Sequence, residues 1–433
     1  MEDLTVSYED LFPKPSALPE ALQTPTRPVS LGSMLALTLA NSVLYMCYIG
    51  IGGLLLPLQI STIDPAHKVV NLGIVTSIAV LLALIGNPLA GALSDRTASR
   101  FGRRRPWIFV GAIVSAFALI ILLSAQSIAM IFIGWAAFQL FSNFILAALT
   151  AIVPDQIPEA QRGTVSGIVG LATSVGSIIG SIIIGIVIRS PGPSYLLLTV
   201  LLLVILVPYS IFLREKTLPK ESVQKFRVGA FLKNFWVDPR KHPDFAWAWL
   251  TRFIPVFGYF LGTGYLFYYL QDAVHYARLF PGQGVEQGVS LLTIVSTLVA
   301  IVFTLVGGIL SDRLKRRKIF IVLANLILAA ALFVFAFVPS WPVLLTTTAL
   351  LGIGFGMYIA VDAALVTLVL PSANNRAKDM GIVNIANTLP QSLAPALAAF
   401  IITATHSYFA LFATGAVVTL LGILVVRPIK AVR

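Results

Sequence analysis

The sequence predicts an all-α membrane protein whose twelve transmembrane helices form two six-helix bundles. Three observations support this fold class. Hydrophobic residues make up 58% of the 433-residue chain and charged residues only 11%, whereas soluble domains are about 45–50% apolar and about 25% charged. The apolar residues fall into blocks of about 20, the length that a helix needs to cross about 30 Å of hydrocarbon. A short charged motif also occurs twice, once in each half of the chain.

The apolar blocks give the expected helices in chain order. They cover residues 33–60, 71–93, 107–125, 128–153, 164–188, 194–213, 245–270, 288–310, 318–338, 342–370, 380–404 and 407–426. Six blocks precede the charged connection 214–244 and six follow it. We therefore expect bundles at 33–213 and 245–427, joined by a cytoplasmic linker at 214–244 and flanked by cytoplasmic tails at 1–32 and 428–433.

The distribution of basic residues predicts the orientation in the membrane. With both termini inside, the outside loops hold only Lys68, Arg189 and Arg278, and the tails and remaining loops hold nearly all the other lysines and arginines. Such an excess is typical of cytoplasmic loops. The net charge of +12 is therefore explained by topology, and we expect no nucleic-acid partner.

The charged motif relates the two halves of the chain. GALSDR at Gly91–Arg96 returns as GILSDR at Gly308–Arg313, 217 residues later, and each copy is followed by basic residues. A second pair has almost the same offset, because Arg162-Gly163 opens the fifth block and Arg376-Ala377 opens the eleventh. The chain is thus expected to be two six-helix repeats.

Twelve helices in two halves, with G-x-L-x-D-R between the second and third helices of each half, resemble the major facilitator superfamily. The resemblance implies that the aspartate of the motif caps a neighbouring helix N-terminus and pairs with arginine, which latches the bundles on the cytoplasmic side. A helix N-terminus has free N–H groups and a partial positive charge, so it attracts a carboxylate. The expected latch groups are Gly91, Asp95 and Arg96 facing Arg376, and Gly308, Asp312 and Arg313 facing Arg162.

Two longer segments resemble a narrower group within that superfamily. SDRTASRFGRRRPW and PDQIPEAQRGTVSG (Pro154–Gly167) are similar to the glycoside–pentoside–hexuronide cation symporters and the related sucrose transporters. This resemblance implies a secondary active transporter of a sugar or glycoside that works by alternating access.

Polar residues on the helices expected to line a central cavity are candidate substrate ligands. In the superfamily fold the site lies near the membrane midplane between the repeats. Neutral amides can bond hydroxyl groups and aromatic rings can pack on a sugar, which favours a small, uncharged polar substrate. For each residue, packing between helices is the alternative. The candidates are Asn41, Tyr45, Tyr48, Gln139, Asn143, Tyr259, Tyr265, Tyr358, Asn384, Asn387 and Gln391.

Two charged residues, Arg252 and Asp362, lie deep within apolar blocks. A charge inside the membrane is costly unless it is paired or hydrated, and it marks a candidate functional site. Both lie at a similar depth from the cytoplasmic end, so we expect an ion pair that couples transport to protons. A static bridge within the second bundle is the alternative. Sodium is less favoured because the first-half helices lack the acids of a melibiose-type sodium site, and no cofactor or metal site is expected.

Other function classes are less well supported. A drug or metabolite exporter of the same fold is the main alternative, but an exporter of lipophilic cations would favour buried acids in the first half. A membrane-embedded enzyme would need a reactive constellation, and Asp362 has no histidine near it in sequence. A transporter-like sensor is a remote alternative. We expect a monomer in the plasma membrane or the bacterial inner membrane, with the lipid bilayer and a small molecule as its partners.

Overall fold

The computed structural model describes residues 25–26, 28–219, 221, 229, 240–369 and 376–429, with the side chains of all of these apart from 363, 367–369 and 376–381. Most of the expected tail 1–32, much of the linker 214–244 and most of the tail 428–433 lie outside the described residues. The side chain of Arg376, expected in one latch, also lies outside them.

Twelve helices within the described residues are long and apolar enough to cross a membrane. They match the twelve predicted blocks in order, which confirms the fold class. The spans of the first half are α1 (Leu31–Ile49), η3 (Gly50–Leu55) and α2 (Leu56–Ile63) in series, α3 (Lys68–Asp95), α4 (Arg105–Leu123), α5 (Ile128–Gln156), α6 (Glu159–Gly180) with η4 (Ser181–Ile188), and α7 (Pro191–Phe212). The η segments are π-helical.

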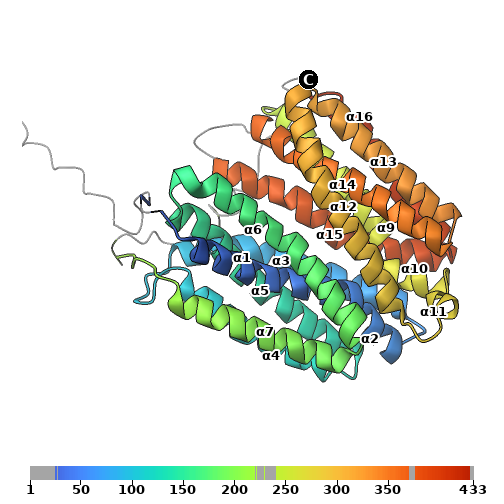
Figure 1. The fold of residues 1–433 in the computed structure, drawn as a ribbon, viewed down its shortest axis with the longest axis horizontal. Coiled ribbons are helices and arrows are strands. Elements are labelled where there is room, and N and C mark those ends of the chain that lie inside the picture. The colour runs from blue at the N-terminus through green and yellow to red at the C-terminus, as the bar shows by residue number, and fades with distance from the viewer. Residues whose placement is uncertain are drawn as a thin grey trace, which may run out of the picture.

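The second half repeats this plan. Its spans are α9 (Pro243–Thr263) with α10 (Leu266–Asp272), α12 (Val285–Leu314), α13 (Arg317–Phe337), α14 (Trp341–Val369), α15 (Arg376–Thr405) and α16 (Tyr408–Val426), and the short helix α11 (Tyr276–Leu279) lies in a connection. The halves form separate bundles, which are blue to green and yellow to red in Figure 1.

Corresponding helices pack in the same way in the two bundles. In the first half α3 and α4 pack against α5, α1 packs against α6, and α4 packs against α7. In the second half α12 and α13 pack against α14, α9 packs against α15, and α13 packs against α16. The packing therefore supports the two-fold relation that the repeated motif predicted.

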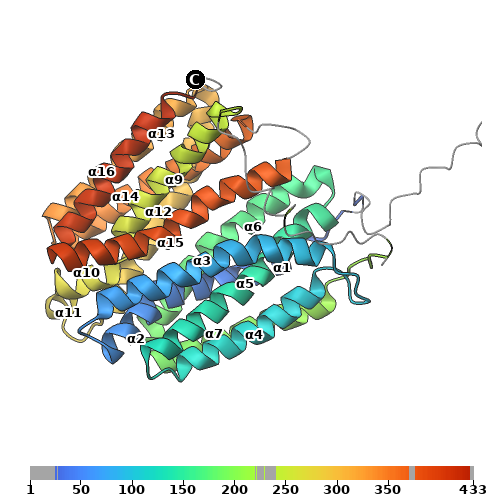
Figure 2. The ribbon, with the colours of Figure 1, turned by 180° about the vertical axis from the view of Figure 1, so that it is seen from behind.

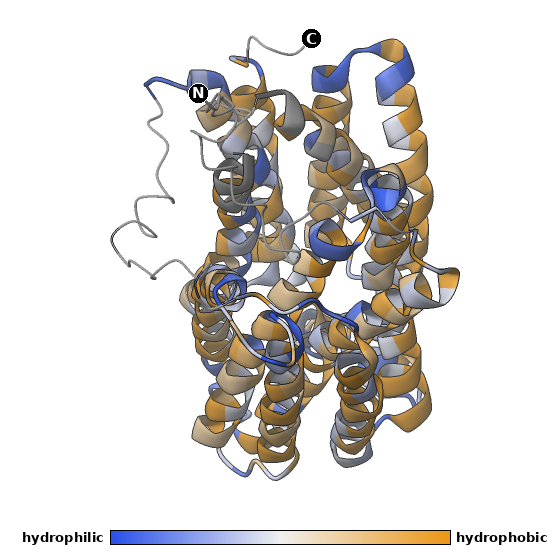
Figure 3. Ribbon diagram, turned by 90° about the vertical axis from the view of Figure 1, so that its left-hand side faces the viewer, coloured by the Kyte–Doolittle hydropathy of each residue, from blue (hydrophilic) through white to orange (hydrophobic). Residues whose placement is uncertain are grey.

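The helix surfaces suit a lipid solvent. Large apolar side chains such as Phe117, Leu305 and Phe400 are more than 60% exposed, and Figure 3 shows hydrophobic residues along most of the length of the helices. In hydrocarbon every backbone N–H and C=O must be bonded within the protein, which helices achieve by themselves. Serines cap several spans. The Oγ atoms of Ser30, Ser127 and Ser407 each accept a hydrogen bond from the backbone N–H three residues later.

The two bundles meet at one end of the molecule. We call the end that holds the loop 96–104 and the described residues 213–219 the tail end, and the opposite end, which holds α2, α10 and α11, the far end (Figures 1 and 2). Between the bundles α15 packs along α3, and η4 packs against α12. Glycines permit this approach, because a Cβ on Gly73 would lie 2.7 Å from Ala399 Cβ and one on Gly185 would lie 2.8 Å from the Glu286 carbonyl oxygen.

Candidate functional site

Arg252 of α9 and Asp362 of α14 form a buried ion pair. The Arg252 Nε donates to Asp362 Oδ2 at 2.5 Å, and a second guanidinium nitrogen contacts the same oxygen. Asp362 is only 2% exposed. Its other oxygen, Oδ1, is buried and has no hydrogen-bond partner among the described residues. Each residue lies about two helical turns from the tail end of its helix, so the pair holds one carboxylate oxygen free within the membrane-spanning region.

Two candidate ligands of the first half, Tyr45 and Tyr48, form a cluster with Ser142 where α1 meets α5. The Tyr48 hydroxyl donates to Ser142 Oγ at 2.9 Å, and the Tyr45 ring lies edge-on to the Tyr48 ring at 6.0 Å. The amide nitrogen of Asn41 donates to the Leu37 carbonyl one turn earlier in α1. In the same way the amide nitrogen of Asn143 donates to the Gln139 carbonyl in α5. These bonds occupy the two amide nitrogens, and the amide oxygen of Asn41 has no described donor.

Trp135 extends this cluster and was missed by sequence reasoning. Its ring stacks on Phe138 at 5.7 Å, and Phe138 in turn meets the Tyr48 ring edge-on. The Trp135 Nε1 is buried and has no acceptor among the residues that the structure describes. A usable signal was present, because Trp135 precedes Gln139 by four residues and so shares its helix face.

The candidates of the second half are dispersed. Asn384 and Asn387 are exposed on α15, and the Gln391 amide donates to the Asn387 carbonyl at 3.0 Å. Tyr259 stacks on Phe355 with 4.2 Å between ring centroids. Within the described contacts, these residues do not join the cluster of the first half.

Tyr265 and Tyr358 are fully buried, and their hydroxyls are bonded to backbone carbonyls. Tyr265 donates to Val69 at 2.9 Å and to Pro395 at 3.2 Å, so it ties the bundles together at the far end. Tyr358 donates to Thr251 at 3.1 Å. Both hydroxyls thus link helices in this structure, and the substrate contact predicted for the two tyrosines stays a prediction.

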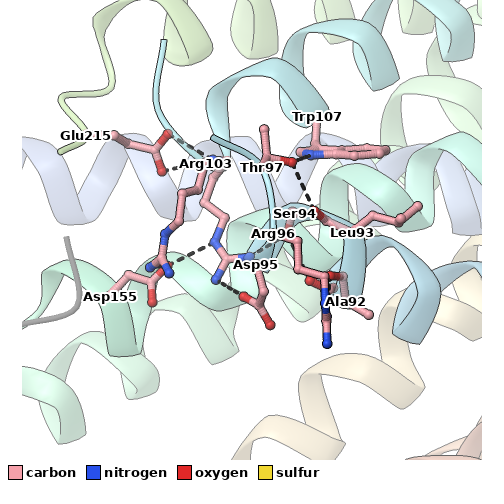
Figure 4. Close-up of polar contacts among 12 residues, drawn as sticks. Ala92, Leu93, Ser94, Asp95, Arg96, Thr97, Arg103, Trp107, Asp155 and Glu215 are labelled. Carbon is pink, nitrogen blue, oxygen red and sulfur yellow. Dashed lines mark hydrogen bonds and ion pairs between the residues drawn. The ribbon is translucent and has the colours of Figure 1, made fainter. Parts of the chain in front are cut away.

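Three of the expected latch residues, Asp95, Asp312 and Arg162, have described partners in their own halves. Asp95 pairs with Arg104 at 2.5 Å (Figure 4), and Asp312 pairs with Arg317 at 3.2 Å. Arg162 bonds the carbonyls of Ile157 and Pro154 and lies 3.7 Å from Glu159. Asp312 and Arg162 are therefore not paired in this structure, and their pairing stays a prediction. The expected contact of Asp95 with Arg376 involves a side chain outside the described set.

The glycines and arginines of the two motif copies have few described contacts with other helices. A Cβ on Gly91 would meet nothing within 4 Å, and one on Gly308 would meet only Ala360, at 3.8 Å. The Arg96 guanidinium donates to the Ala92 carbonyl of its own helix, and Arg313 is exposed. The described residues thus leave open space beside both motif glycines in this state.

Around Asp95 the tail end of the first bundle holds a charge network (Figure 4). Asp155 accepts from Arg103 and Arg104, each at 2.9 Å. Glu215 lies 110 residues after Arg105. Its carboxylate accepts hydrogen bonds from the backbone N–H groups of Arg104 and Arg105 at the start of α4. Burial raises the pKa of Glu215, although these N–H donors act in the opposite direction. The network anchors the segment after α7 to the start of α4.

At the far end an ion pair crosses between the bundles. Lys68, at the start of α3, bonds Asp272 at 2.6 Å and Gln271 at 2.9 Å. The other oxygen of Asp272 accepts from the Tyr408 hydroxyl at 2.8 Å. The described hydrogen bonds and ion pairs that join the bundles all lie in the far half of the helices, so this structure is closed at the far end.

Comparison with known sequences places this arrangement in a family. The sequence pattern of the Major Facilitator Superfamily matches residues 33–285 and 282–432. These matches span nearly the whole chain, and the chain belongs to that superfamily. The superfamily consists of membrane transporters, so the chain is grouped with transporters and not with enzymes.

Three curated relatives match parts of the chain. It is 28% identical over 131 residues to lactose permease of Leuconostoc lactis, covering 27% of this chain and 19% of the permease. It is 26% identical over 224 residues to multidrug resistance protein 2 of Bacillus subtilis, covering 50% and 54%. It is 49% identical over 53 residues to proton-associated sugar transporter A of Mus musculus, covering 12% and 7%. Each match spans less than two thirds of the relative.

Solved structures share the fold. The chain superimposes on a nucleoside transporter with a TM-score of 0.74 and 11% identity, covering 92% of this chain and 100% of the other. It superimposes on a bacterial homologue of the human lysosomal transporter Spinster, in an inward-facing and unoccupied conformation, with a TM-score of 0.68 and 14% identity, covering 92% and 95%.

Proposed function

We propose that this protein is a secondary active transporter that moves a sugar or glycoside together with protons by alternating access between its two bundles. The buried Arg252–Asp362 pair carries the proposal. Its free carboxylate oxygen is a place for a proton, and the neighbouring guanidinium favours the charged form of the acid. Protonation weakens the pair, so proton binding and helix packing are linked.

The arrangement of the bundles supports alternating access. The bonded contacts described between them lie at the far end, and the acids of the repeated motif pair within their own halves at the tail end. If both termini are cytoplasmic, as proposed, the open tail end makes this an inward-facing state. The opposite state would separate Lys68 from Asp272 and bring the motif acids to the other bundle.

A neutral polar substrate is supported by the residues at the α1–α5 junction. They include tyrosine, tryptophan and amide side chains, and the only acids of the first-half spans, Asp95, Asp155 and Glu159, lie at helix ends on the tail side. Two of the three relatives described above are named as a lactose permease and a sugar transporter. The relative named for multidrug resistance keeps a drug–proton exporter as the second candidate.

Transport by reconstituted protein tests the proposal. Proteoliposomes would be given an inward proton gradient, a sodium gradient or neither, with radiolabelled lactose, maltose or sucrose, and with tetraphenylphosphonium as a lipophilic cation. We expect one of the sugars to accumulate under the proton gradient alone. Accumulation driven by sodium, or transport restricted to the cation, would contradict the proposal.

The variant Asp362→Asn tests the role of the pair. It keeps the shape of the side chain but cannot carry a proton, so we expect gradient-driven accumulation to be lost while exchange of labelled for unlabelled sugar persists. Asp64→Asn, at a loop acid on the far side, is the control and should accumulate normally. If Asp362→Asn accumulates sugar like the wild type, Asp362 has no coupling role.

A further inference from the structure

Pro255 breaks the hydrogen-bond ladder of α9 beside the buried ion pair. Proline has no backbone N–H, so the carbonyl four residues earlier, on Thr251, loses its helical donor. The Tyr358 hydroxyl of α14 donates to this carbonyl at 3.1 Å and to that of Arg252 at 3.3 Å. Tyr358 therefore takes the place of the missing donor at the break.

Tyr358 also lies next to the ion pair. It precedes Asp362 by four residues, so both project from the same face of α14. Arg252 completes the group from α9, and its own carbonyl is one of the two that Tyr358 bonds. On α13, Arg317 approaches the next turn of α14 through the Ala364 carbonyl. The ionisable groups that face Asp362 in the described residues are thus Arg252 and Tyr358.

A phenol has a single proton to donate. In this structure the proton is directed to the α9 carbonyls, and Asp362 Oδ1 has no partner among the residues described. A protonated Oδ1 could donate to the Tyr358 oxygen while Tyr358 still donates to Thr251. An ionised Oδ1 instead competes with the two carbonyls for the one phenolic proton.

We propose that Tyr358 is a positioning residue that links the protonation of Asp362 to the break in α9, by turning its one proton between the Asp362 carboxylate and the carbonyls of Thr251 and Arg252. When Asp362 is protonated, the chain Asp362–Tyr358–Thr251 is complete and holds the break closed. When Asp362 is ionised, Tyr358 turns to it and the carbonyls at the break lose their donor. This proposal rests on the proposed role of Asp362 as the proton carrier.

Infrared titration of the purified protein tests the proposal without a known substrate. The absorption band of a protonated carboxyl group would be followed with pH, and the band that disappears in Asp362→Asn assigned to Asp362. In Tyr358→Phe the ionised form loses its better hydrogen bond, because bonds to charged groups are the stronger ones. We therefore expect the midpoint of the band to rise by about half to one pH unit, since one unit corresponds to about 1.4 kcal/mol.

The variant Pro255→Ala makes the opposite prediction. It restores an N–H for the Thr251 carbonyl and so releases the Tyr358 proton for the carboxylate. The midpoint should fall, and in a Tyr358→Phe background the same substitution should have no effect. Because this variant keeps Tyr358, it tests the link even if Tyr358→Phe folds poorly.

Tyr269→Phe is the matched control. Tyr269 is likewise buried in the second bundle and donates to a backbone carbonyl, that of Phe335, at 2.8 Å, but it does not contact the pair. A merely structural role for Tyr358 would lower thermal stability in both variants and leave the midpoint unchanged in both, which would overturn this inference alone. If Asp362→Asn retains every titrating carboxyl band, the proposed proton site itself fails.

Discussion

Asn325 of α13 has no exposed surface, and neither atom of its amide has a hydrogen-bond partner among the described residues. A Cβ added to Gly422 would lie 3.1 Å from the Asn325 amide nitrogen and 2.7 Å from Pro255 Cγ, so the three residues lie close together. A buried amide without partners costs about 1–3 kcal/mol. We expect Asn325→Leu to stabilise the protein by about that amount, since leucine has the same branched shape and no polar atoms. Thermal denaturation in detergent, followed by tryptophan fluorescence, measures the change.

Gln59 serves as the control, because its buried amide is hydrogen-bonded at both its nitrogen and its oxygen. Its amide nitrogen donates to the Leu122 carbonyl at 2.8 Å and its oxygen accepts from the Tyr195 hydroxyl at 3.0 Å. Gln59→Leu should therefore lower the melting temperature, because it leaves two buried partners unbonded. A lower melting temperature in both variants would indicate that Asn325 is bonded in the membrane, through a water molecule for example.

Glu215 makes the stability of the tail end depend on pH. Its pKa is raised in the folded protein, chiefly by burial, so the folded state binds this proton more tightly than the unfolded state. The stabilisation is then complete below the ordinary pKa of glutamate and is lost as pH rises through the raised pKa. We expect Glu215→Gln, which stays neutral, to gain stability relative to the wild type across this window. Melting temperatures measured from pH 4 to pH 8 would test it.

The exposed Glu159 supplies the reference for that experiment. Glu159→Gln changes a carboxylate on the same end of the first bundle, where the side chain is 77% exposed, and should reproduce the wild-type profile. A constant difference between Glu215→Gln and the wild type at every pH would show that the N–H bonds at α4, rather than burial of the charge, decide the stability.

For single residues, the sequence predicts a pair only where a charged side chain has few possible partners. Arg252 and Asp362 are predicted because charges deep in apolar blocks need each other and the helical rise fixes their depth. The pairing of Asp95 with Arg104 could not be predicted, since Arg103, Arg104 and Arg105 are adjacent in one loop and only the fold selects among them. Lys68 and Asp272 looked like ordinary residues at helix ends.

At the scale of elements, apolar block length predicted all twelve spans. The helices continue into polar residues that the blocks exclude, so the fifth span begins at Glu159 rather than at residue 164. The π-helical segments Gly50–Leu55 and Ser181–Ile188 were not predicted, because an extra residue in a helical turn leaves no mark on hydrophobicity. Both segments contact α12 at the interface between the bundles, so their form is set by packing.

The contact of η4 with α12 can be tested by placing a larger side chain at Gly185. A Cβ on Gly185 would collide with Ser290 Oγ and lie 2.8 Å from the Glu286 carbonyl oxygen. We expect Gly185→Leu to force the far end open. A cysteine at Ser77, a residue whose carbonyl accepts from Ser392 across the α3–α15 interface, should then react faster with a soluble maleimide. The single native cysteine, Cys47, is buried and gives little background.

Gly170→Leu is the control for steric bulk in the same span. A Cβ on Gly170 would meet nothing within 4 Å, so labelling of the Ser77→Cys reporter should stay at its original rate. Equal labelling of the Gly170→Leu and Gly185→Leu proteins would mean that the far end does not open at η4.

For the whole molecule, the repeated motif predicts two related bundles but not the state in which they are found. Asp95 and Asp312 occupy equivalent places, yet each contacts an arginine of its own half, and the space beside Gly91 and Gly308 is open. A latch that forms in one state of a cycle cannot be assigned from residue spacing, because the sequence is the same in both states. The pseudo-symmetry nevertheless relates the two ends, since rigid bundles that separate at one end approach at the other.

This relation gives a prediction about the tail end. Cysteines at Gly163 and Arg313 would flank Arg162 and Asp312 without replacing either, and both positions are exposed. In this conformation the described contacts of Arg162 and Asp312 all lie in their own halves, so oxidation should give little crosslink. When Gly185→Leu is added, the far end opens and rigid bundles must close at the tail end, and the crosslinked fraction should rise severalfold, as seen by mobility in denaturing gels with and without reductant. Gly170→Leu should leave it low. If the Ser77→Cys reporter becomes reactive but the tail-end crosslink does not increase, the bundles deform instead of rocking as rigid bodies, and the pairing of Asp312 with Arg162 does not belong to the opposite state.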